Sequence, residues 1–176
     1  MPARIWVPAY VGIGSNLDDP DRQVQAAFEA LAELPNTRRV CRSATVRNPA
    51  LGPRPQPDFV NAVAGLLTRL SPIDLLDALL AIERGQGRDR SSGVRWGPRR
   101  IDLDLLVYGD VVQDTDRLVI PHPGIASRNF VLLPLLEIAP GLRVPGLGPV
   151  RHLAAALEQQ EPQAWAIPVT SPSKVR

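Results

Sequence analysis

The spacing of apolar residues divides the chain into short strands and amphipathic helices. Apolar residues that alternate, or run together between turn residues, predict four main strands, at residues 5–13, 38–47, 59–68 and 101–108. Apolar residues that recur every three or four positions predict three helices, at residues 21–34, 71–85 and 150–160. Pro8 indicates that the first strand starts at Ala9 or lies at an edge, because proline lacks the N–H that a central strand uses.

The order strand, helix, strand, strand, helix, strand is that of a split βαβ unit. It predicts an α+β protein with a ferredoxin-like core, in which helices cover one face of an antiparallel sheet. The helix at residues 150–160 is an extra C-terminal element. We expect a single domain over residues 1–160 and a poorly patterned tail over residues 161–176.

Positive charge is concentrated in one segment. The chain has 20 Lys and Arg against 18 Asp and Glu, a net charge of +2, and its only lysine is Lys174. Residues 84–100 contain six arginines and one acid, Asp89, so this segment carries +5 and the rest of the chain −3. No Gly-Lys-Ser/Thr tripeptide is present, so a bound polyphosphate would be held by arginine rather than by a Walker-type loop.

Several classes of protein are disfavoured by the sequence. No apolar run approaches the ~18–20 residues that span a bilayer, and the N-terminus lacks the apolar core of a signal peptide. The single cysteine, Cys41, cannot form an internal disulfide. We therefore expect a cytoplasmic protein that does not act at a membrane.

Asp102 and Asp104 form the most specific candidate site. Side chains alternate along a strand, so the two carboxylates share one face of the strand at 101–108. The opposite face is apolar and is predicted to hold Ile101, Leu103, Leu105 and Val107. An isolated Asp-x-Asp pair more often belongs to a solvated face that pairs with arginines. Arg99 and Arg100 directly precede this strand, however, and carboxylates beside arginines suit Mg²⁺ and phosphoryl transfer.

Aromatic and polar residues form two further clusters. Phe59 and Asn61 share one strand face, where a ring and an amide can stack on and hydrogen-bond to a planar heterocycle, although a lone Phe is more often core. His122 lies between two prolines and either binds phosphate or is incidental. Phe130 either faces Phe59 across a slot or belongs to the core, and Trp96 is either a ligand contact or a buried anchor.

A nucleic-acid-binding module that uses the basic loop 84–100 is the alternative function. Two observations oppose it: aromatic residues make up only 5% of the chain, and the two aspartates would repel a phosphate backbone without a metal ion.

The motifs together resemble those of the 6-hydroxymethyl-7,8-dihydropterin pyrophosphokinase family. The strongest match is the run from Arg95 to Leu106, which reads RWGPRRIDLDLL. Other matching elements follow in the family's order over roughly residues 9–140: GSNL at 14–17, NP at 48–49, LGP at 51–53, QPDFVN at 56–61, Glu83 with GRDR at 87–90, and PH at 121–122 with Arg128 and Phe130.

The resemblance implies transfer of pyrophosphate from ATP to the hydroxymethyl group of the pterin in folate biosynthesis, with AMP as the other product. It implies Asp102 and Asp104 as ligands of two Mg²⁺ ions, and Arg88 and Arg99 as catalytic contacts to the phosphates. The remaining ATP contacts that it implies are Glu83, Arg90, Trp96, Leu105, His122 and Arg128. The pterin contacts that it implies are Asn48, Leu51, Phe59, Asn61, Trp96 and Phe130. It also implies a monomer with small-molecule partners and no nucleic acid.

Overall fold

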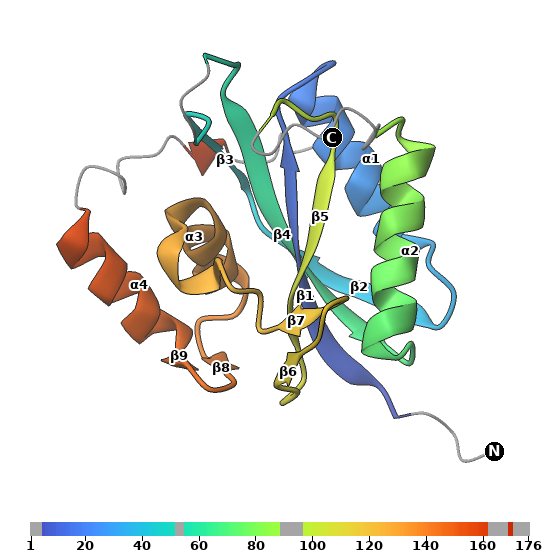
Figure 1. The fold of residues 1–176 in the computed structure, drawn as a ribbon, viewed down its shortest axis with the longest axis vertical. Helices are drawn as coiled ribbons and strands as arrows, with labels where there is room; N and C mark the ends of the chain where they lie inside the picture. Colours follow the sequence, from blue (N-terminus) through green and yellow to red (C-terminus); the bar gives the residue numbers. More distant parts are fainter. Residues whose placement is uncertain (1–4, 52–54, 89–96, 162–168, 171–176) are drawn as a thin grey trace, which may run out of the picture.

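A computed structural model of the chain describes residues 5–51, 55–88, 97–161 and 169–170. Its centre is an antiparallel sheet of six strands (Figure 1): β1 (Val7–Ser15), β2 (Thr37–Arg42), β3 (Thr45–Asn48), β4 (Phe59–Thr68), β5 (Asp102–Tyr108) and β10 (Val169–Thr170). The strands follow the order β10-β3-β4-β1-β5, and β2 pairs with β4. β4 is therefore central, β1 lies between β4 and β5, and β5 lies at one edge.

β2 and β3 act as one interrupted strand. Both pair with β4 on the side away from β1, β2 along residues 64–68 and β3 along residues 59–61. At the break between them, the backbone N–H of Ser43 donates to the Val63 carbonyl, and the Val63 N–H donates to the Ser43 hydroxyl, each at 2.9 Å. The predicted extended segment at 38–47 is thus confirmed as two pieces, and the element order is that of a ferredoxin-like core.

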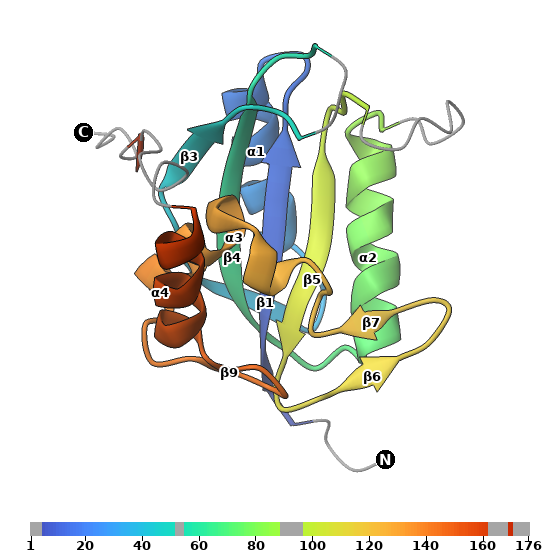
Figure 2. The same cartoon turned by 60° about the vertical axis from the view of Figure 1, so that its left-hand side comes forward.

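Helices cover both faces of the sheet (Figure 2). α1 (Pro20–Ala32) and α2 (Pro72–Gly85) lie on one face, over the larger apolar core. On the other face α3 (Asn129–Ile138) packs on β3 and β4, and α4 (Val150–Gln160) packs on α3. The prediction of helices on one face was therefore incomplete, because Val63 and Leu106 give the second face an apolar core of its own.

The helix boundaries follow local chemistry. Ser71 caps α2: its hydroxyl accepts the N–H of Asp74 at 3.1 Å, and the Asp74 carboxylate accepts the N–H of Ser71 at 3.4 Å. The C-terminal helix is confirmed at residues 150–160. None of the helices in the described ranges is long and apolar enough to cross a membrane.

β1 begins at Val7, includes Pro8 and lies between β4 and β5, so both expectations, a start at Ala9 and a place at an edge, were wrong. The Pro8 carbonyl accepts the N–H of Gly109 at 2.8 Å, which places the missing N–H of the proline on the β5 side. β5 ends at Tyr108, which pairs with Ala9, so the ladder between β1 and β5 stops before Pro8. No residue of β5 therefore needs a hydrogen bond from the backbone nitrogen of Pro8. Pro8 is tolerated for this reason.

A bulge in β5 changes the predicted arrangement of its side chains. Tyr10 pairs with Val107 and Val11 with Leu105, so Leu106 is an extra residue in the ladder. Leu103 and Leu105 point to the core under α1 and α2, as predicted, but Val107 belongs to the opposite core together with Leu106. The assignment of Val107 to the first face was wrong because the bulge reverses the alternation.

Short elements complete the described fold: β6 (Gln113–Asp114), β7 (Val119–Ile120), η1 (Ile125–Ser127), β8 (Arg143–Val144) and β9 (Gly148–Pro149). From the poorly patterned tail, the structure describes β10, which pairs with β3. Two tail residues therefore extend the sheet beside the strand that ends at Asn48.

Candidate active site

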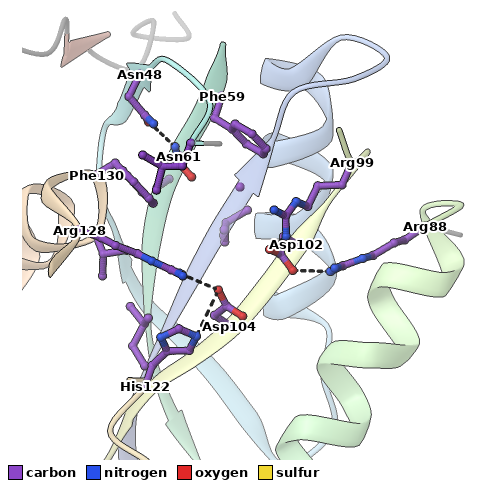
Figure 3. Close-up of a pocket in the computed structure, with 17 residues that line it drawn as sticks. Asn48, Phe59, Asn61, Arg88, Arg99, Asp102, Asp104, His122, Arg128 and Phe130 are labelled. Atoms are coloured by element: carbon purple, nitrogen blue, oxygen red, sulfur yellow. Dashed lines mark hydrogen bonds and ion pairs between the residues drawn. The ribbon is translucent and has the colours of Figure 1, made fainter. Parts of the chain in front are cut away.

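A cleft of about 390 Å³ lies on the face of the sheet that α3 covers only in part. Gly12 and Gly14 of β1 leave room at its floor because they present no side chain there. The cleft brings together most of the residues predicted for the site: Asn48, Leu51, Phe59, Asn61, Arg88, Arg99, Asp102, Asp104, His122, Arg128 and Phe130. They come from β3, β4 and β5, from the start of α3, and from the segments that follow β3, α2 and β7 and precede β5 (Figure 3).

Asp102 is held by two arginines. Its Oδ2 accepts a hydrogen bond from Nη1 of Arg99 at 2.6 Å, and its Oδ1 is hydrogen-bonded to Nη1 of Arg88 (Figure 3). The Arg88 side chain is 13% exposed, and its Nη1 also lies 2.5 Å from Oε1 of Glu83. Burial lowers the pKa of Arg88, but the charges of Asp102 and then Glu83 outweigh this effect and raise it overall. Arg88 is thus a fixed cation beside the predicted metal ligand.

Asp104 has weaker partners on the other side of the cleft. Its Oδ2 lies 3.7 Å from Nε2 of His122 and 3.9 Å from Nη1 of Arg128. Burial, and then the charge of Asp102, raise the pKa of Asp104 to about 7, although the Arg128 and Arg99 charges oppose the shift. The pair therefore contains one carboxylate that is hydrogen-bonded to two arginines and one that readily takes up a proton or a cation.

The β5 bulge and a tight turn position His122. The carbonyl of Leu106, the extra residue, accepts the N–H of His122 at 2.9 Å. Nδ1 of the imidazole accepts the N–H of Gly124 at 3.0 Å, so in the neutral ring the proton is on Nε2, which faces Asp104. Burial, and then the charge of Arg128, lower the pKa of His122, which favours this neutral form.

Aromatic rings and amides line the other end of the cleft. Phe59 from β4 and Phe130 from α3 both reach it (Figure 3). Nδ2 of Asn61 donates to Oδ1 of Asn48 at 2.5 Å, which leaves Oδ1 of Asn61 above Gly14 as an acceptor. The Arg99 guanidinium lies 5.5 Å from the centre of the Phe59 ring, within the range of a cation–π contact. Arg99 therefore links the carboxylate end of the cleft to the aromatic end.

Sequence reasoning missed the role of Asn16, although it noted the GSNL motif. Asn16 is 2% exposed and joins two loops that border the cleft. Its Oδ1 accepts the N–H of Arg99 at 2.8 Å, and its Nδ2 donates to Oε1 of Gln56 at 3.1 Å and to the Pro57 carbonyl at 3.0 Å. The available signal in the sequence was an asparagine directly after an apolar strand. The structure shows that this asparagine is buried, and a buried amide requires hydrogen-bond partners.

Four predicted residues are not placed in the cleft. Glu83 is 1% exposed and lies behind Arg88, and the Leu105 side chain is buried in the core under α1 and α2. Arg90 and Trp96 lie outside the described residues.

Comparisons with known proteins identify the family of the chain. The family model for 7,8-dihydro-6-hydroxymethylpterin-pyrophosphokinase (HPPK) matches residues 10–140. A 2-amino-4-hydroxy-6-hydroxymethyldihydropteridine pyrophosphokinase from Pseudomonas aeruginosa is 51% identical over 148 residues, which is 84% of this chain and 88% of the relative. The enzyme of the same name from Haemophilus influenzae is 48% identical over 139 residues, 79% of this chain and 86% of the relative.

Solved structures agree with the fold. An HPPK-DHPS structure in complex with substrates has a TM-score of 0.69 at 11% identity, and the match covers 94% of this chain and 46% of the other. Wild-type HPPK-DHPS from Plasmodium falciparum with pteroate also has a TM-score of 0.69, at 12% identity, over 94% and 47% of the two chains. The chain thus spans less than half of these longer proteins, and the likeness concerns the fold alone.

The family match and the two curated relatives favour an enzyme over the nucleic-acid-binding alternative. Together with the ferredoxin-like core and the cleft, they show that the chain belongs to the 7,8-dihydro-6-hydroxymethylpterin-pyrophosphokinase family.

Proposed function

We propose that this enzyme transfers pyrophosphate from ATP to the hydroxymethyl group of 6-hydroxymethyl-7,8-dihydropterin in folate biosynthesis. The observation that carries the proposal is the shape of the cleft, in which Asp102 and Asp104 with their arginines adjoin a slot lined by Phe59 and Phe130. One end suits a polyphosphate, and the other suits a flat heterocycle. The names of the two relatives support the pterin as the acceptor and pyrophosphate as the group transferred.

In the proposed reaction the hydroxymethyl oxygen of the pterin bonds to the β-phosphorus of ATP. The bond from that phosphorus to the oxygen that bridges it to the α-phosphate breaks, AMP keeps this oxygen, and the hydroxyl proton is released. Arg88 and Arg99 neutralise charge on the phosphates as it shifts, because planar guanidinium groups bind phosphate oxygens in pairs. Arg128 and the Nε2–H of His122 lie across the cleft as further phosphate donors.

Asp102 and Asp104 are the proposed metal ligands. Within the described ranges, no group of three or more His, Cys, Asp or Glu side chains forms a metal cluster. The aspartate pair nevertheless fits Mg²⁺, which uses one or two carboxylates together with substrate phosphates. Bound Mg²⁺, two ions in the proposal, would supply charge neutralisation at the phosphates. The high pKa of Asp104 agrees with a carboxylate that needs a cation beside it.

The pterin is proposed to lie between Phe59 and Phe130. The free Oδ1 of Asn61 accepts hydrogen bonds from the ring edge, and the Asn48 contact fixes this orientation of the amide. Leu51 closes the slot at its rim.

The wider assignments are also proposals. Residues 1–160 are taken as the catalytic domain, acting as a cytoplasmic monomer on small molecules rather than on nucleic acid. Arg90 and Trp96 are proposed to join the ATP site, and Trp96 the pterin site as well.

The test is the identity of the nucleotide product. The purified protein is incubated with ATP, Mg²⁺ and 6-hydroxymethyl-7,8-dihydropterin, and the nucleotides are separated by chromatography. We expect AMP and pterin pyrophosphate in equal amounts, and no AMP when the pterin is left out. ADP as the nucleotide product would contradict the proposal.

A further inference from the structure

Glu83 is a buried carboxylate next to the cleft but not part of its lining. It lies near the end of α2 and is 1% exposed, whereas Arg88 and Asp102 both line the cleft. A buried carboxylate is costly unless hydrogen bonds and a positive charge stabilise it. The partners of Glu83 therefore indicate what it does.

The first partner is the backbone of β5. Oε1 of Glu83 accepts the N–H of Leu103 at 2.8 Å. β5 is the edge strand of the described sheet, so this outward-facing N–H has no neighbouring strand to pair with. Leu103 lies between Asp102 and Asp104, so Glu83 fixes the stretch of backbone that carries both proposed metal ligands.

The second partner is Arg88. Its Nη1 lies 2.5 Å from the same Oε1 of Glu83 and is also hydrogen-bonded to Asp102. The Arg88 backbone N–H donates to the Glu83 carbonyl at 3.0 Å as well. If Asp102 held a divalent cation, it would be less available to Arg88. Glu83 would then be the carboxylate that keeps the Arg88 guanidinium at the edge of the cleft.

We propose that Glu83 is a positioning residue that acts through Arg88 and the Leu103 amide, and does not bind the nucleotide. It keeps Arg88 in place when Asp102 turns to the metal. This inference rests on the proposed function, since the task of Arg88 is to meet the phosphates.

The first test is Glu83→Gln, because the amide retains an acceptor for the Leu103 N–H but loses the charge that holds Arg88. We expect kcat to fall about tenfold, as for loss of a charged hydrogen bond, while KM for ATP stays within about twofold. Combined with Arg88→Ala, Glu83→Gln should lower kcat no further than Arg88→Ala alone. A raised KM for ATP, or additive losses, would overturn the proposal.

The second test needs no turnover. Phenylglyoxal modification of Arg88 is followed by mass spectrometry in the Mn²⁺-loaded, nucleotide-free protein. We expect faster modification in Glu83→Gln than in the wild type, with Arg100 as the internal reference. The matched control is Asp77→Asn, which removes a carboxylate of the same helix that pairs with Arg117 at the surface and should change neither readout.

The two tests separate this proposal from the function itself. If the wild type makes no AMP, the proposed function fails, and the rate of Arg88 modification alone decides the role of Glu83. An unchanged rate in Glu83→Gln overturns the positioning role whether or not the enzyme is active.

Discussion

Oδ1 of Asn16 accepts the backbone N–H of Arg99 at 2.8 Å, and the Asn16 backbone N–H donates to the Arg99 carbonyl at 3.1 Å. These two bonds join the end of β1 to the residue that binds Asp102. The Asn16 amide also reaches Gln56, so a single buried side chain holds both borders of the cleft.

Asn16→Ala should therefore lower stability and activity more than the neighbouring substitution Ser15→Ala does. We expect a loss of about 2 kcal/mol in the free energy of unfolding, since several buried hydrogen bonds lose a partner, and a fall in kcat/KM of at least about tenfold. Urea unfolding and steady-state kinetics measure the two effects. Ser15→Ala is the control, because among the described residues the Ser15 hydroxyl makes one long hydrogen bond, to the Leu17 carbonyl at 3.5 Å. Equal kinetics for the two variants would contradict this role.

Asp102→Ala should abolish most turnover. It removes a proposed metal ligand and leaves Arg88 and Arg99 without the carboxylate that they share. We expect AMP formation to fall by at least about a hundredfold, with a circular dichroism spectrum like that of the wild type. Asp114→Ala, at an exposed position on β6, should leave the rate unchanged. Near-normal activity of Asp102→Ala would refute the assignment.

The raised pKa of Asp104 predicts how stability depends on pH. The pKa rises from 3.8 to about 7 in the fold, so between these values the native state holds a proton that the unfolded chain has released. The stability that this proton contributes is complete below about pH 4 and is lost as the pH rises through 7.

Asp104→Asn should therefore stabilise the metal-free protein at pH 8 and have little effect near pH 4, because asparagine cannot ionise. Thermal unfolding in the presence of a chelator at both pH values measures the difference, with Asp114→Asn as the exposed control. A stabilisation of equal size at both pH values would show that ionisation of Asp104 is not its cause.

Gly14→Ala should weaken pterin binding. A Cβ at this position would lie 2.8 Å from Oδ1 of Asn61, so the amide has to move from the orientation that Asn48 sets. We expect KM for the pterin to rise about tenfold, while KM for ATP changes little. Gly141→Ala is the matched control, since nothing lies within 4 Å of a Cβ there. An unchanged KM for the pterin would show that Asn61 does not read the substrate.

Much of the fold follows from local patterns in the sequence. The apolar run of β4, the alternation at the start of β5 and the capping residues Ser71 and Asp74 each act over a few positions. They can therefore be read without tertiary context. The shared face of Asp102 and Asp104 was predictable for the same reason. Motif resemblance then connected these positions to a family, which the comparison over residues 10–140 confirms.

The tertiary structure decided which charged side chains lie beside Asp102 and Asp104. Local alternation does not reveal the extra residue at Leu106, which reverses the face of Val107 and directs the Leu106 carbonyl to His122. Nor does it show that Asp102 bonds to two arginines while Asp104 faces His122 and Arg128.

The sequence alone thus determined most strands of the main sheet, three of the four α-helices that the structure describes, the carboxylate pair and the family likeness. The fold determined the partners of the site residues and added α3 (Asn129–Ile138), which no local pattern had predicted. The hydrogen bonds from the Leu103 N–H to Glu83 and from the Arg99 N–H to Asn16 join segments that are tens of residues apart in the sequence. Such contacts depend on strand register and on how the helices pack, and these are set by the sum of many weak interactions across the whole core rather than by any local pattern.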